Sequence, residues 1–236
     1  MVRARAFRFA PRLVPTLAAA AFVALTVSLG RWQAHRAQEK EARQALYEAR
    51  MAEPAVRLTG ATGPADTLLF RHVRATGRWI ADRQVYVDNR VHLGRAGFEV
   101  VTPLEIAGTK EAVLVNRGWI ARTGAYPRPP RVPVPRGEVE VTGLATVPPA
   151  HFLELSSDVI EGSVFQNLSI ERYRAWSGLP VLPVVILADP PGGGLAAVAE
   201  RPDAGVAMHR QYEFTWFLLA ATAAALWLGL NLRRAR

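Results

Sequence analysis

The stretch LVPTLAAAAFVALTVSL, from Leu13 to Leu29, contains 17 residues and no charged group. A second uncharged run of 17 residues extends from Phe214 to Leu230. At about 1.5 Å per residue, each run folded as a helix covers roughly 26 Å, close to the thickness of hydrocarbon that a membrane helix crosses. We therefore predict two transmembrane helices, at residues 13–30 and 214–230, with a domain at residues 31–213 between them.

The positive charge of the chain is concentrated at its two ends. Seven of the nine formal net charges come from arginines outside the apolar runs, namely Arg3, Arg5, Arg8, Arg12, Arg233, Arg234 and Arg236. The segment between Arg31 and Glu213 holds 22 basic and 20 acidic residues, which argues against a nucleic-acid-binding domain. Because basic flanks stay in the cytoplasm, residues 1–12 and 231–236 are predicted to be cytoplasmic tails, and the central domain to be periplasmic in a bacterial inner membrane or to face the mitochondrial intermembrane space.

The first apolar run has an alternative interpretation as a cleaved signal peptide. Its basic start and alanine-rich centre fit, and Ser28-Leu29-Gly30 resembles a small-x-small cleavage site, although the run is longer than a usual signal core of about 7–15 residues. The chain has no cysteine. A disulfide framework, covalent c-type haem attachment, thiol redox chemistry and a cysteine copper site are therefore excluded.

The central domain is predicted to be an α+β domain dominated by antiparallel strands. A helix is expected to continue from the first span through Arg31–Met51, and a second helix is expected within Val164–Ser177, with Asn167 or Ser169 as its cap. Segments of strand character are expected at 68–80, 84–91, 98–106, 112–120, 138–145 and 182–188, the first two and the next two forming hairpins, and in 138–145 Val139 and Val141 alternate with polar residues. The proline-rich strip Gly124–Gly137 is expected to be extended, and Asp189–Gly205 to be a mobile linker.

A cluster of polar and aromatic residues is predicted where the two spans leave the membrane. In a helix over 207–230, His209, Tyr212 and Trp216 share one face. Trp32, Arg36 and Lys40 form a stripe on the first helix at the same level. A neutral imidazole can ligate haem iron, aromatic rings can cover the macrocycle, and basic residues can bind its propionates. The alternative is an interfacial aromatic belt with solvated charges, and His35 is a rival ligand.

The strand VLVNRGWI (Val113–Ile120) carries an arginine among core-facing positions. Alternation places Arg117 and Trp119 on one face, so Arg117 is expected to be paired, stacked on Trp119, or placed at a rim where a partner binds. His72, His92 and His151 lack metal-ligand spacing, Ser156-Ser157-Asp158 reads as a helix cap, and no catalytic or nucleotide-binding motif is present. The sequence does not predict an enzyme.

Several blocks resemble the Surfeit locus protein one family of membrane proteins. LGRWQAHRAQEK (29–40) resembles its L-G-x-W-Q-x-x-R-x-x-x-K block, GFEVVTPL (97–104) and VLVNRGWI its central pair, FQNLSIERY (165–173) its N-L-D-I-x-R-Y region, and MHRQYEFTWF (208–217) its H-x-x-Y-A-x-x-W-F block. Glu213 stands where the family usually has alanine, so it should face away or pair, for example with Arg210.

The resemblance implies an assembly factor for haem-copper cytochrome c oxidase in the respiratory chain. It implies that the protein assists incorporation of haem a into subunit I, alongside other assembly factors, and that His209 occupies the position of a proposed haem ligand. Arg117 and Trp119 belong to the family's Arg-Gly-Trp triplet, and we assign them to partner binding. A scaffold that grips an oxidase intermediate without haem is the alternative; a sensor and a copper chaperone fit less well, because the tails are short and cysteine is absent.

Overall fold

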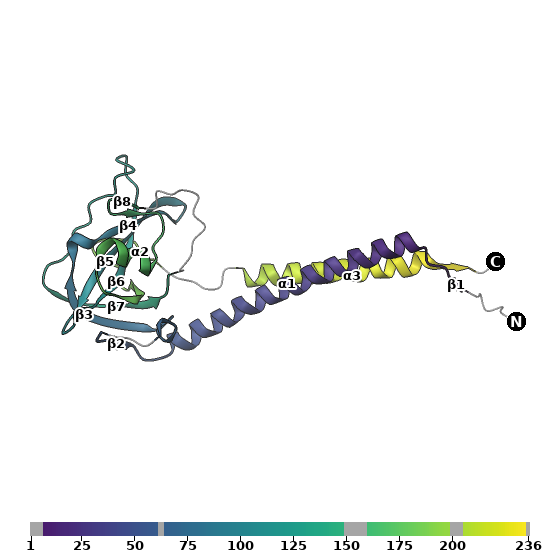
Figure 1. Cartoon of the computed structure of the whole chain (residues 1–236), viewed down its shortest axis with the longest axis horizontal. Helices are drawn as coiled ribbons and strands as arrows, with labels where there is room; N and C mark the ends of the chain where they lie inside the picture. Colours follow the sequence, from purple (N-terminus) through teal and green to yellow (C-terminus); the bar gives the residue numbers. More distant parts are fainter. Residues whose placement is uncertain (1–6, 61–63, 149–159, 199–204, 235–236) are drawn as a thin grey trace. The chain divides into compact units, whose positions relative to one another are not determined.

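The computed structural model describes residues 7–60, 64–148, 160–198 and 205–234, and Figure 1 labels the helices and strands. The chain divides into two compact units. One unit joins residues 1–45 with residues 201–236 and is helical, and the other contains residues 46–200 and is built on a sheet.

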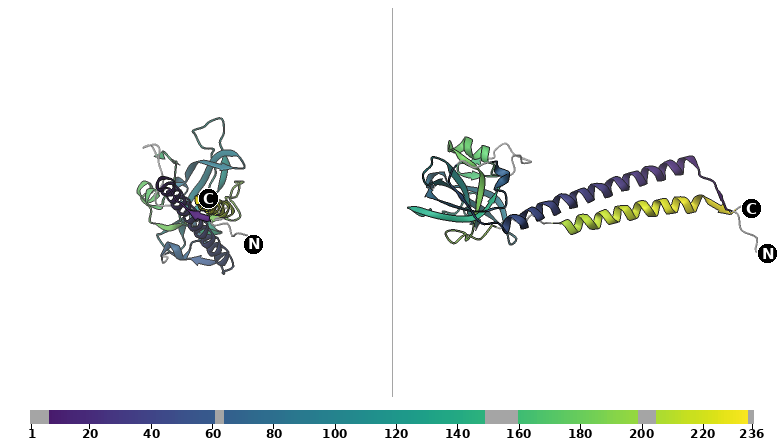
Figure 2. Two further views of the ribbon diagram at one scale, coloured as in Figure 1. Left: turned by 90° about the vertical axis from the view of Figure 1, so that its right-hand side faces the viewer. Right: turned by 90° about the horizontal axis from the view of Figure 1, so that it is seen from below.

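The helical unit contains two long antiparallel helices. Helix α1 (Leu13–Met51) runs without a break through the Ser28-Leu29-Gly30 stretch and ends before Pro54, as predicted, its last turns belonging to the sheet unit. Helix α3 (Val206–Asn231) lies beside it in Figure 1 and in the right-hand view of Figure 2. Among the described residues, these are two helices long and apolar enough to cross a membrane, and most of their side chains are not buried by protein.

The two helices approach closely where their side chains are small. The ring of Phe217 on α3 would come within 3.0 Å of a Cβ atom placed at Gly30 on α1. Thr26, Gly30 and Ala37 are buried on α1, as is Ala220 on α3. Small residues at such an interface let two membrane helices pack backbone against backbone.

The far ends of the helices are joined by a short ribbon. Strand β1 (Phe7–Phe9) pairs antiparallel with β11 (Leu232–Arg234), and the ring of Phe9 contacts Trp227 edge to face at 5.5 Å. The described ends of the chain therefore lie at the same end of the helix pair, which is the arrangement that an even number of membrane spans requires (Figure 2).

The sheet unit is a mixed sheet that closes on itself. Its strands are β2 (Val56–Leu58), β3 (His72–Trp79), β4 (Val85–His92), β5 (Arg95–Ile106), β6 (Ala112–Ala121), β7 (Glu138–Thr146), β8 (Ile160–Glu161), β9 (Val164–Phe165) and β10 (Val181–Ala188). They pair in the order β2-β3-β7-β10-β6-β5-β4-β9-β8, and an additional β3–β5 pairing closes β3, β7, β10, β6 and β5 into a ring. Closure removes the exposed edges that an open five-stranded sheet would have.

The expectation of an antiparallel sheet holds only in part. Strand β10 lies parallel to β6, β2 to β3 and β4 to β9, whereas the other pairings of the described strands are antiparallel. Residues 98–106 and 112–120 form the predicted hairpin within β5 and β6, and the strands predicted at 138–145 and 182–188 are β7 and β10.

Other local predictions were wrong. Strands β3 and β4 do not form a hairpin: the 3-10 helix η2 (Ala81–Arg83) separates them, and each pairs with a different part of β5. The strand predicted from Leu68 begins only at His72, because Phe70 has a left-handed φ of 62° that a strand cannot contain. A 3-10 helix, η1 (Ala65–Thr67), precedes it.

The second predicted helix is shorter than expected. Residues 164–165 form β9, and helix α2 (Ile170–Ser177) begins only at Ile170. The Ser169 side chain accepts a hydrogen bond from the Arg172 amide, so Ser169 is the cap and Asn167 is not. Gly178, with a left-handed φ of 71°, ends the helix.

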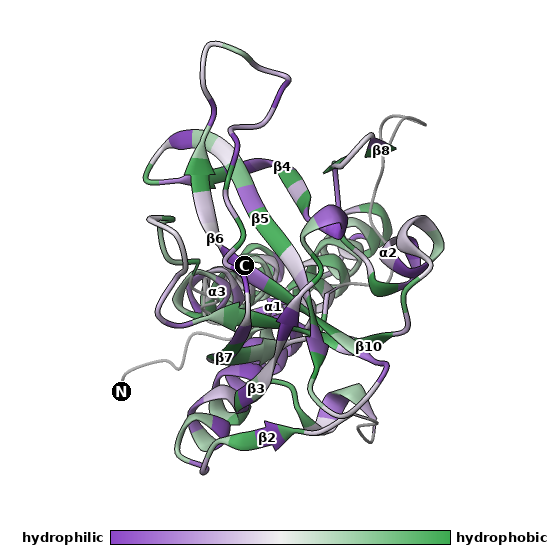
Figure 3. Ribbon diagram, turned by 90° about the vertical axis from the view of Figure 1, so that its left-hand side faces the viewer, coloured by the Kyte–Doolittle hydropathy of each residue, from purple (hydrophilic) through white to green (hydrophobic). Residues whose placement is uncertain are grey.

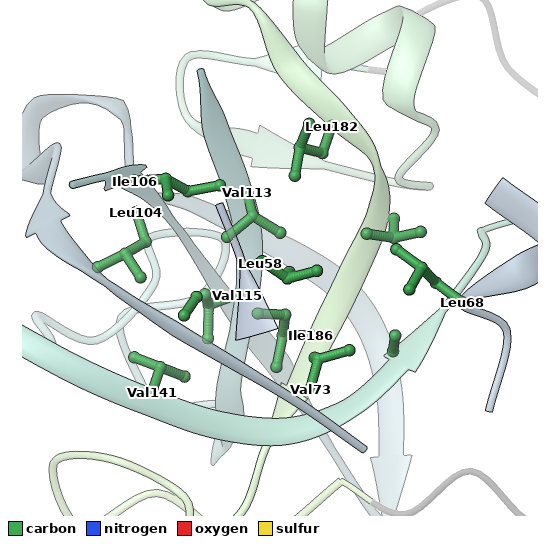
Figure 4. Close-up of a cluster of buried hydrophobic side chains, with 13 residues drawn as sticks. Leu58, Leu68, Val73, Leu104, Ile106, Val113, Val115, Val141, Leu182 and Ile186 are labelled. Carbon is green, nitrogen blue, oxygen red and sulfur yellow. The ribbon is translucent and has the colours of Figure 1, made fainter. Parts of the chain in front are cut away.

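The core lies inside the ring and on one outer face of it. Leu104, Val113, Val115, Ile186 and neighbouring apolar side chains fill the ring (Figure 4). A second cluster packs α2 and β9 against the outside of β6 and β10, with Phe165 and Tyr173 at its centre. Strands β6 and β10 are thus buried on both faces, which explains the apolar runs Ala112–Val115 of β6 and Val184–Ala188 of β10; Figure 3 colours the ribbon by hydropathy.

Candidate functional site

His209 lies in the first turns of α3, where its amide donates to the carbonyl of Gly205 at 3.1 Å. Its ring nitrogen Nδ1 is 2.6 Å from Oε1 of Gln33 on α1. A carboxamide oxygen can only accept a hydrogen bond, so Nδ1 carries the proton in this contact. The lone pair of the neutral ring then lies on Nε2, the nitrogen that is left to bind a metal.

The predicted stripe of α1 lies at the level of this histidine, and its Trp32 contacts the imidazole. The rings of Trp32 and His209 meet edge to face, with centroids 6.5 Å apart. The guanidinium carbon of Arg36 is 5.9 Å from the centre of the Trp32 ring. Lys40 lies near the start of α3, where a Cβ atom placed at Gly205 would be 3.4 Å from Lys40 Nζ. The structure therefore brings Trp32, Arg36 and Lys40 to the same end of the helix pair as His209.

The other two predicted aromatic residues do not contact the imidazole. Among the described residues, no ring contact joins Tyr212 or Trp216 to His209, and Tyr212 is 50% exposed. The rival ligand His35 has its Nδ1 3.1 Å from Glu39 Oε1, and its side chain is 71% exposed. His35 therefore stands on the outside of α1, whereas His209 is held between α1 and α3.

Acidic residues balance the cations around His209. Arg210 forms ion pairs with Glu41 at 2.8 Å and with Glu213 at 2.9 Å, so the expected pairing of Glu213 with Arg210 is confirmed. Arg36 donates to Glu39 at 2.8 Å, and this hydrogen bond lowers the pKa of the Glu39 carboxyl. These pairs are exposed, and an incoming carboxylate can exchange with such partners at small cost.

Gln33 and Glu41 were missed by the sequence analysis. Both lie on the face of α1 that carries the buried residues Thr26, Gly30 and Ala37, at spacings of three, four and seven residues. The small residues at 26, 30 and 37 could have indicated these two side chains, because small residues mark the face of a helix on which a second helix can pack. Gln33 and Glu41 on that face were therefore the side chains most able to reach α3.

In the sheet unit, Arg117 occupies a β-bulge of β6. Val100 pairs with Gly118 and Val101 with Asn116, so Arg117 is the extra residue in the ladder. Gly118 has a φ of 134°, and its amide donates to the side-chain oxygen of Asn116 at 3.1 Å. The Asn-Arg-Gly sequence thus makes the bulge, and the bulge turns the Arg117 side chain out of the regular alternation.

The guanidinium of Arg117 is buried among neutral groups. Only 2% of the residue is exposed, and it donates to Gln84 Oε1 and to the Pro133 carbonyl, each at 3.0 Å. Its guanidinium carbon is 5.5 Å from the centre of the Trp79 ring. Within the described residues it forms no ion pair, and burial lowers the pKa of Arg117. Of the three arrangements expected for Arg117, the structure shows a paired side chain, held by Gln84 and Pro133, and the aromatic ring beside it is Trp79 rather than Trp119.

Trp119 packs away from Arg117, against β4, and only 8% of the residue is exposed. Its Nε1 donates to the Arg90 carbonyl at 2.8 Å, and its ring lies 5.0 Å from that of His92. Its backbone pairs with Ala196 through hydrogen bonds of 2.8 and 2.9 Å. The first part of the predicted linker is therefore docked on β6 rather than mobile; residues 199–204 lie outside the described residues.

No group of three or more metal-binding side chains occurs in the described parts of the chain. His72 and His92 lie on β3 and β4. His151 and the Ser156-Ser157-Asp158 stretch lie outside the described residues. His209 is thus a single histidine, and an axial ligand of a macrocycle is the metal-binding role that suits one imidazole.

Comparison with known proteins agrees with the motif resemblance. The model of the SURF1 family matches residues 20–221. A SURF1-like protein of Monosiga brevicollis is 29% identical, over 88% of this chain and 84% of its own. Surfeit locus protein 1 of Takifugu rubripes is 24% identical, over 89% of this chain and 94% of its own, and that of Rattus norvegicus is 27% identical over 89% and 74%.

Proposed function

The chain belongs to the SURF1 family, and from this membership we propose that it is a non-enzymatic assembly factor for cytochrome c oxidase. Its task is to promote the incorporation of haem a into oxidase subunit I, together with other assembly factors. Haem a is the cargo in this proposal. The protein binds it at the outer membrane face and releases it to the histidines of the oxidase subunit by ligand exchange.

The observation that carries the proposal is the hydrogen bond between His209 and Gln33. Axial histidines commonly donate their second ring nitrogen to a fixed acceptor, which sets the tautomer and the orientation of the ring. Gln33 Oε1, 2.6 Å from Nδ1, is such an acceptor. The residues present therefore fit an iron ligand at Nε2, with a neutral second partner that strengthens the imidazole less than a carboxylate would. A bond of moderate strength between this imidazole and the haem iron suits a cargo that the protein must release.

The cations near His209 fit the two propionates of the cargo. Arg36 pairs only with the exposed Glu39 among described acids, and a propionate can take the place of that carboxylate. Lys40 lies near the first turn of α3, where the helix dipole adds positive potential. Glu213 does not oppose this binding, because Arg210 pairs with it at 2.9 Å.

The first experiment is to purify the full chain from cells that make haem a and to record its absorption spectrum. We expect a bound haem a band in the wild type, a loss of that band in His209→Ala, and retention in His35→Ala, whose side chain points outward. A wild-type protein without bound haem would remove the cargo from the proposal.

A sharper experiment tests the hydrogen bond itself. Gln33→Met keeps the size and helix propensity of the side chain and removes the acceptor, so haem affinity should fall by roughly 10–100-fold, as for other second-sphere partners of metal ligands. Gln38→Met is the matched control, since Gln38 is exposed on the same helix. Equal affinities in the two variants would show that Gln33 does not orient His209.

The proposed location is the inner membrane, with two spans, cytoplasmic ends and a periplasmic sheet unit. The chain has no cysteine, so a single introduced cysteine reports on its side of the membrane without background. Leu93 is 90% exposed at the β4–β5 turn. A membrane-impermeant maleimide should label Leu93→Cys in cells with a permeabilised outer membrane. Labelling only after the inner membrane is broken would place the sheet unit in the cytoplasm.

A scaffold that holds an oxidase intermediate without haem is the second candidate. The observation in its favour is that Arg117, through its hydrogen bond to the Pro133 carbonyl, fixes the proline-rich strip, in which Arg128 and Arg131 are exposed. In this alternative, oxidase assembly is normal in His209→Ala and defective when Arg128 and Arg131 are both replaced by serine. The haem proposal expects the opposite pattern.

A further inference from the structure

A small pocket in the sheet unit opens onto the buried guanidinium of Arg117. Its volume is about 230 Å³, and its walls include Trp79 from β3, Val141 from β7 and the glycines at 192 and 193. The volume is below the roughly 300–1,000 Å³ typical of drug-sized ligands, so the occupant has to be small. All of these residues belong to the sheet unit, and the haem proposal uses none of them.

The pocket presents hydrogen-bond donors that are not matched by acceptors. A guanidinium has five N–H groups, and Arg117 uses two of them, toward Gln84 and Pro133, in the contacts that the structure describes. The Trp79 Nε1 atom is also buried, and no acceptor for it occurs among the described residues. A buried cation without a carboxylate partner is costly, and a ligand that brings an anionic oxygen removes that cost.

The glycines of the Pro190–Gly194 loop keep one side of this guanidinium uncovered. The Gly192 amide donates to the Arg117 carbonyl at 3.0 Å, which holds the loop against the bulge. A Cβ atom at Gly193 would lie 3.2 Å from Arg117 Nη2, and one at Gly192 would lie 3.6 Å from Arg117 Nε. Side chains at these two positions would therefore fill the space beside the charge, and glycine leaves that space to a ligand.

We propose that this pocket binds a monocarboxylate carried on a small apolar body, with Arg117 receiving the carboxylate. Valine, proline and tryptophan side chains in the wall suit an apolar body, and a guanidinium fork suits a carboxylate. Two acids, Glu140 and Asp189, also line the pocket, and their charges select against a ligand with a second negative charge. Glu140 is partly compensated by Arg74 at 3.5 Å, whereas Asp189 lies exposed. A free organic acid and the C-terminal residue of a polypeptide both have the required chemistry.

The test uses the full chain in detergent micelles, with the Nε–Hε signal of Arg117 observed by NMR and assigned by its loss in Arg117→Lys. The probes are benzoate, its neutral analogue benzamide, N-acetylphenylalanine as a model of a chain terminus, and inorganic phosphate. Benzoate, N-acetylphenylalanine or both should shift the Arg117 signal in a saturable titration, benzamide should not, and phosphate should bind at least about tenfold more weakly.

Two matched glycine variants separate binding in the pocket from binding elsewhere. Asparagine tolerates a left-handed backbone, and Gly193 and Gly194 have φ values of 68° and 75°. Gly193→Asn places a side chain beside the guanidinium and should weaken carboxylate binding by at least about tenfold. Gly194→Asn should bind as the wild type does, because nothing lies within 4 Å of its Cβ position.

The proposal is supported if benzoate or N-acetylphenylalanine gives a saturable shift that benzamide does not give and that Gly193→Asn weakens. The tighter-binding probe of the two tells whether the natural ligand is a free organic acid or the C-terminal residue of a polypeptide. The proposal is overturned by no saturable shift with either carboxylate, by equal binding of benzoate and benzamide, or by binding that survives in Gly193→Asn. A folded-state check is provided by the dispersion of the remaining amide signals in each variant.

Discussion

The two units of the chain bury different amounts of apolar surface. In the sheet unit, three clusters of side chains are enclosed by protein, and residues such as Phe165, Leu104 and Ile186 are completely buried. In the described parts of the helical unit, the long apolar helices bury few residues, namely Thr26, Gly30, Ala37, Ala220 and Asn231. Exposed apolar surface of this extent is what the proposed membrane spans require.

The polar contacts of the two units differ in the same way. In the helical unit, the ion pairs of Arg210 and Arg36 are exposed, and each joins opposite charges. In the sheet unit, Arg117 is enclosed and bonded to neutral acceptors. Exposed pairs exchange partners easily, whereas an enclosed cation is fixed in place. This difference fits the two proposals: exchange of a charged cargo at the helical unit, and recognition of a carboxylate with fixed geometry at the sheet unit.

The largest expected effect comes from emptying the core of the sheet unit. Phe165 is fully buried, and its ring contacts Trp176 at 5.5 Å. Phe165→Ala should lower the free energy of unfolding of the sheet unit by about 3–5 kcal/mol, because it leaves a cavity in the cluster that α2 and β9 form against β6 and β10. The measurement is urea denaturation of the full chain in micelles, followed by near-ultraviolet circular dichroism.

Phe214→Ala in the helical unit is the matched control. Phe214 is 68% exposed on α3, so the change removes only surface that faces lipid or detergent. The unfolding midpoint of the sheet unit should stay that of the wild type. A similar loss in both variants would mean that the two units do not have separate cores, and the comparison would fail.

A second prediction concerns the bulge that places Arg117. A Cβ atom at Gly118 would be 2.6 Å from Leu195 Cβ and 2.7 Å from the Ala196 carbonyl oxygen, at a φ of 134°. Gly118→Ala should therefore cost about 2–4 kcal/mol, from backbone strain and from displacement of the segment docked on β6. We also expect faster proteolytic cleavage near Ala196, measured by mass spectrometry of timed digests.

Gly94→Ala separates the two contributions. Gly94 has a φ of 76° but nothing within 4 Å of its Cβ position, so it reports the backbone strain alone, about 1–2 kcal/mol. If both variants lost the same stability and Gly118→Ala showed no additional cleavage, the docking of residues 190–196 on β6 would not depend on Gly118.

Local sequence patterns predicted the elements that depend on local chemistry. The two apolar runs identified α1 and α3, and short segments of strand character identified β5, β6, β7 and β10, because both patterns are visible locally along the chain. The pairing of β10 with β6, parallel and between strands distant in sequence, left no local signal. The prediction of a β3–β4 hairpin was wrong for the same reason. A short connection favours a hairpin, but both strands pair with β5 instead of with each other.

The candidate sites show the same limit. Helical spacing placed Trp32 and Arg36 on one stripe, and the structure brings both near His209. Gln33 was overlooked because its partner is on the other helix, and a stripe on one helix does not say which face the second helix covers. For Arg117, strict alternation predicted a neighbour on the same face, and one extra residue in the ladder changed that neighbour from Trp119 to Trp79.

The smallest expected effect concerns Glu99, a carboxyl inside the sheet unit. Burial raises the pKa of Glu99, although Arg90 and a hydrogen bond from Asn116, at 2.8 Å, both lower it. A raised pKa means that folding opposes ionisation of this carboxyl. The sheet unit therefore loses stability as the pH rises from the ordinary value of 4.5 through the raised pKa, and it bears no such penalty below 4.5, where the carboxyl is protonated in both states.

Glu99→Gln should remove this pH dependence, since glutamine still accepts from Asn116 and cannot ionise. We expect the variant to melt a few degrees above the wild type at pH 7.5, and the two to melt together near pH 4, by circular dichroism of the full chain in micelles.

Glu39 in the helical unit is the control, because its pKa shift has the opposite sign. The hydrogen bond from Arg36 lowers the pKa of Glu39, which favours the charged form, and Glu39→Gln should not raise the melting temperature at either pH. A Glu99→Gln variant that melted below the wild type at pH 7.5 would mean that attraction to Arg90 outweighs the cost of burial. The enclosed charges of the sheet unit would then be as well compensated as the exposed ion pairs of the helices. The two units would then differ in apolar burial but not in electrostatics.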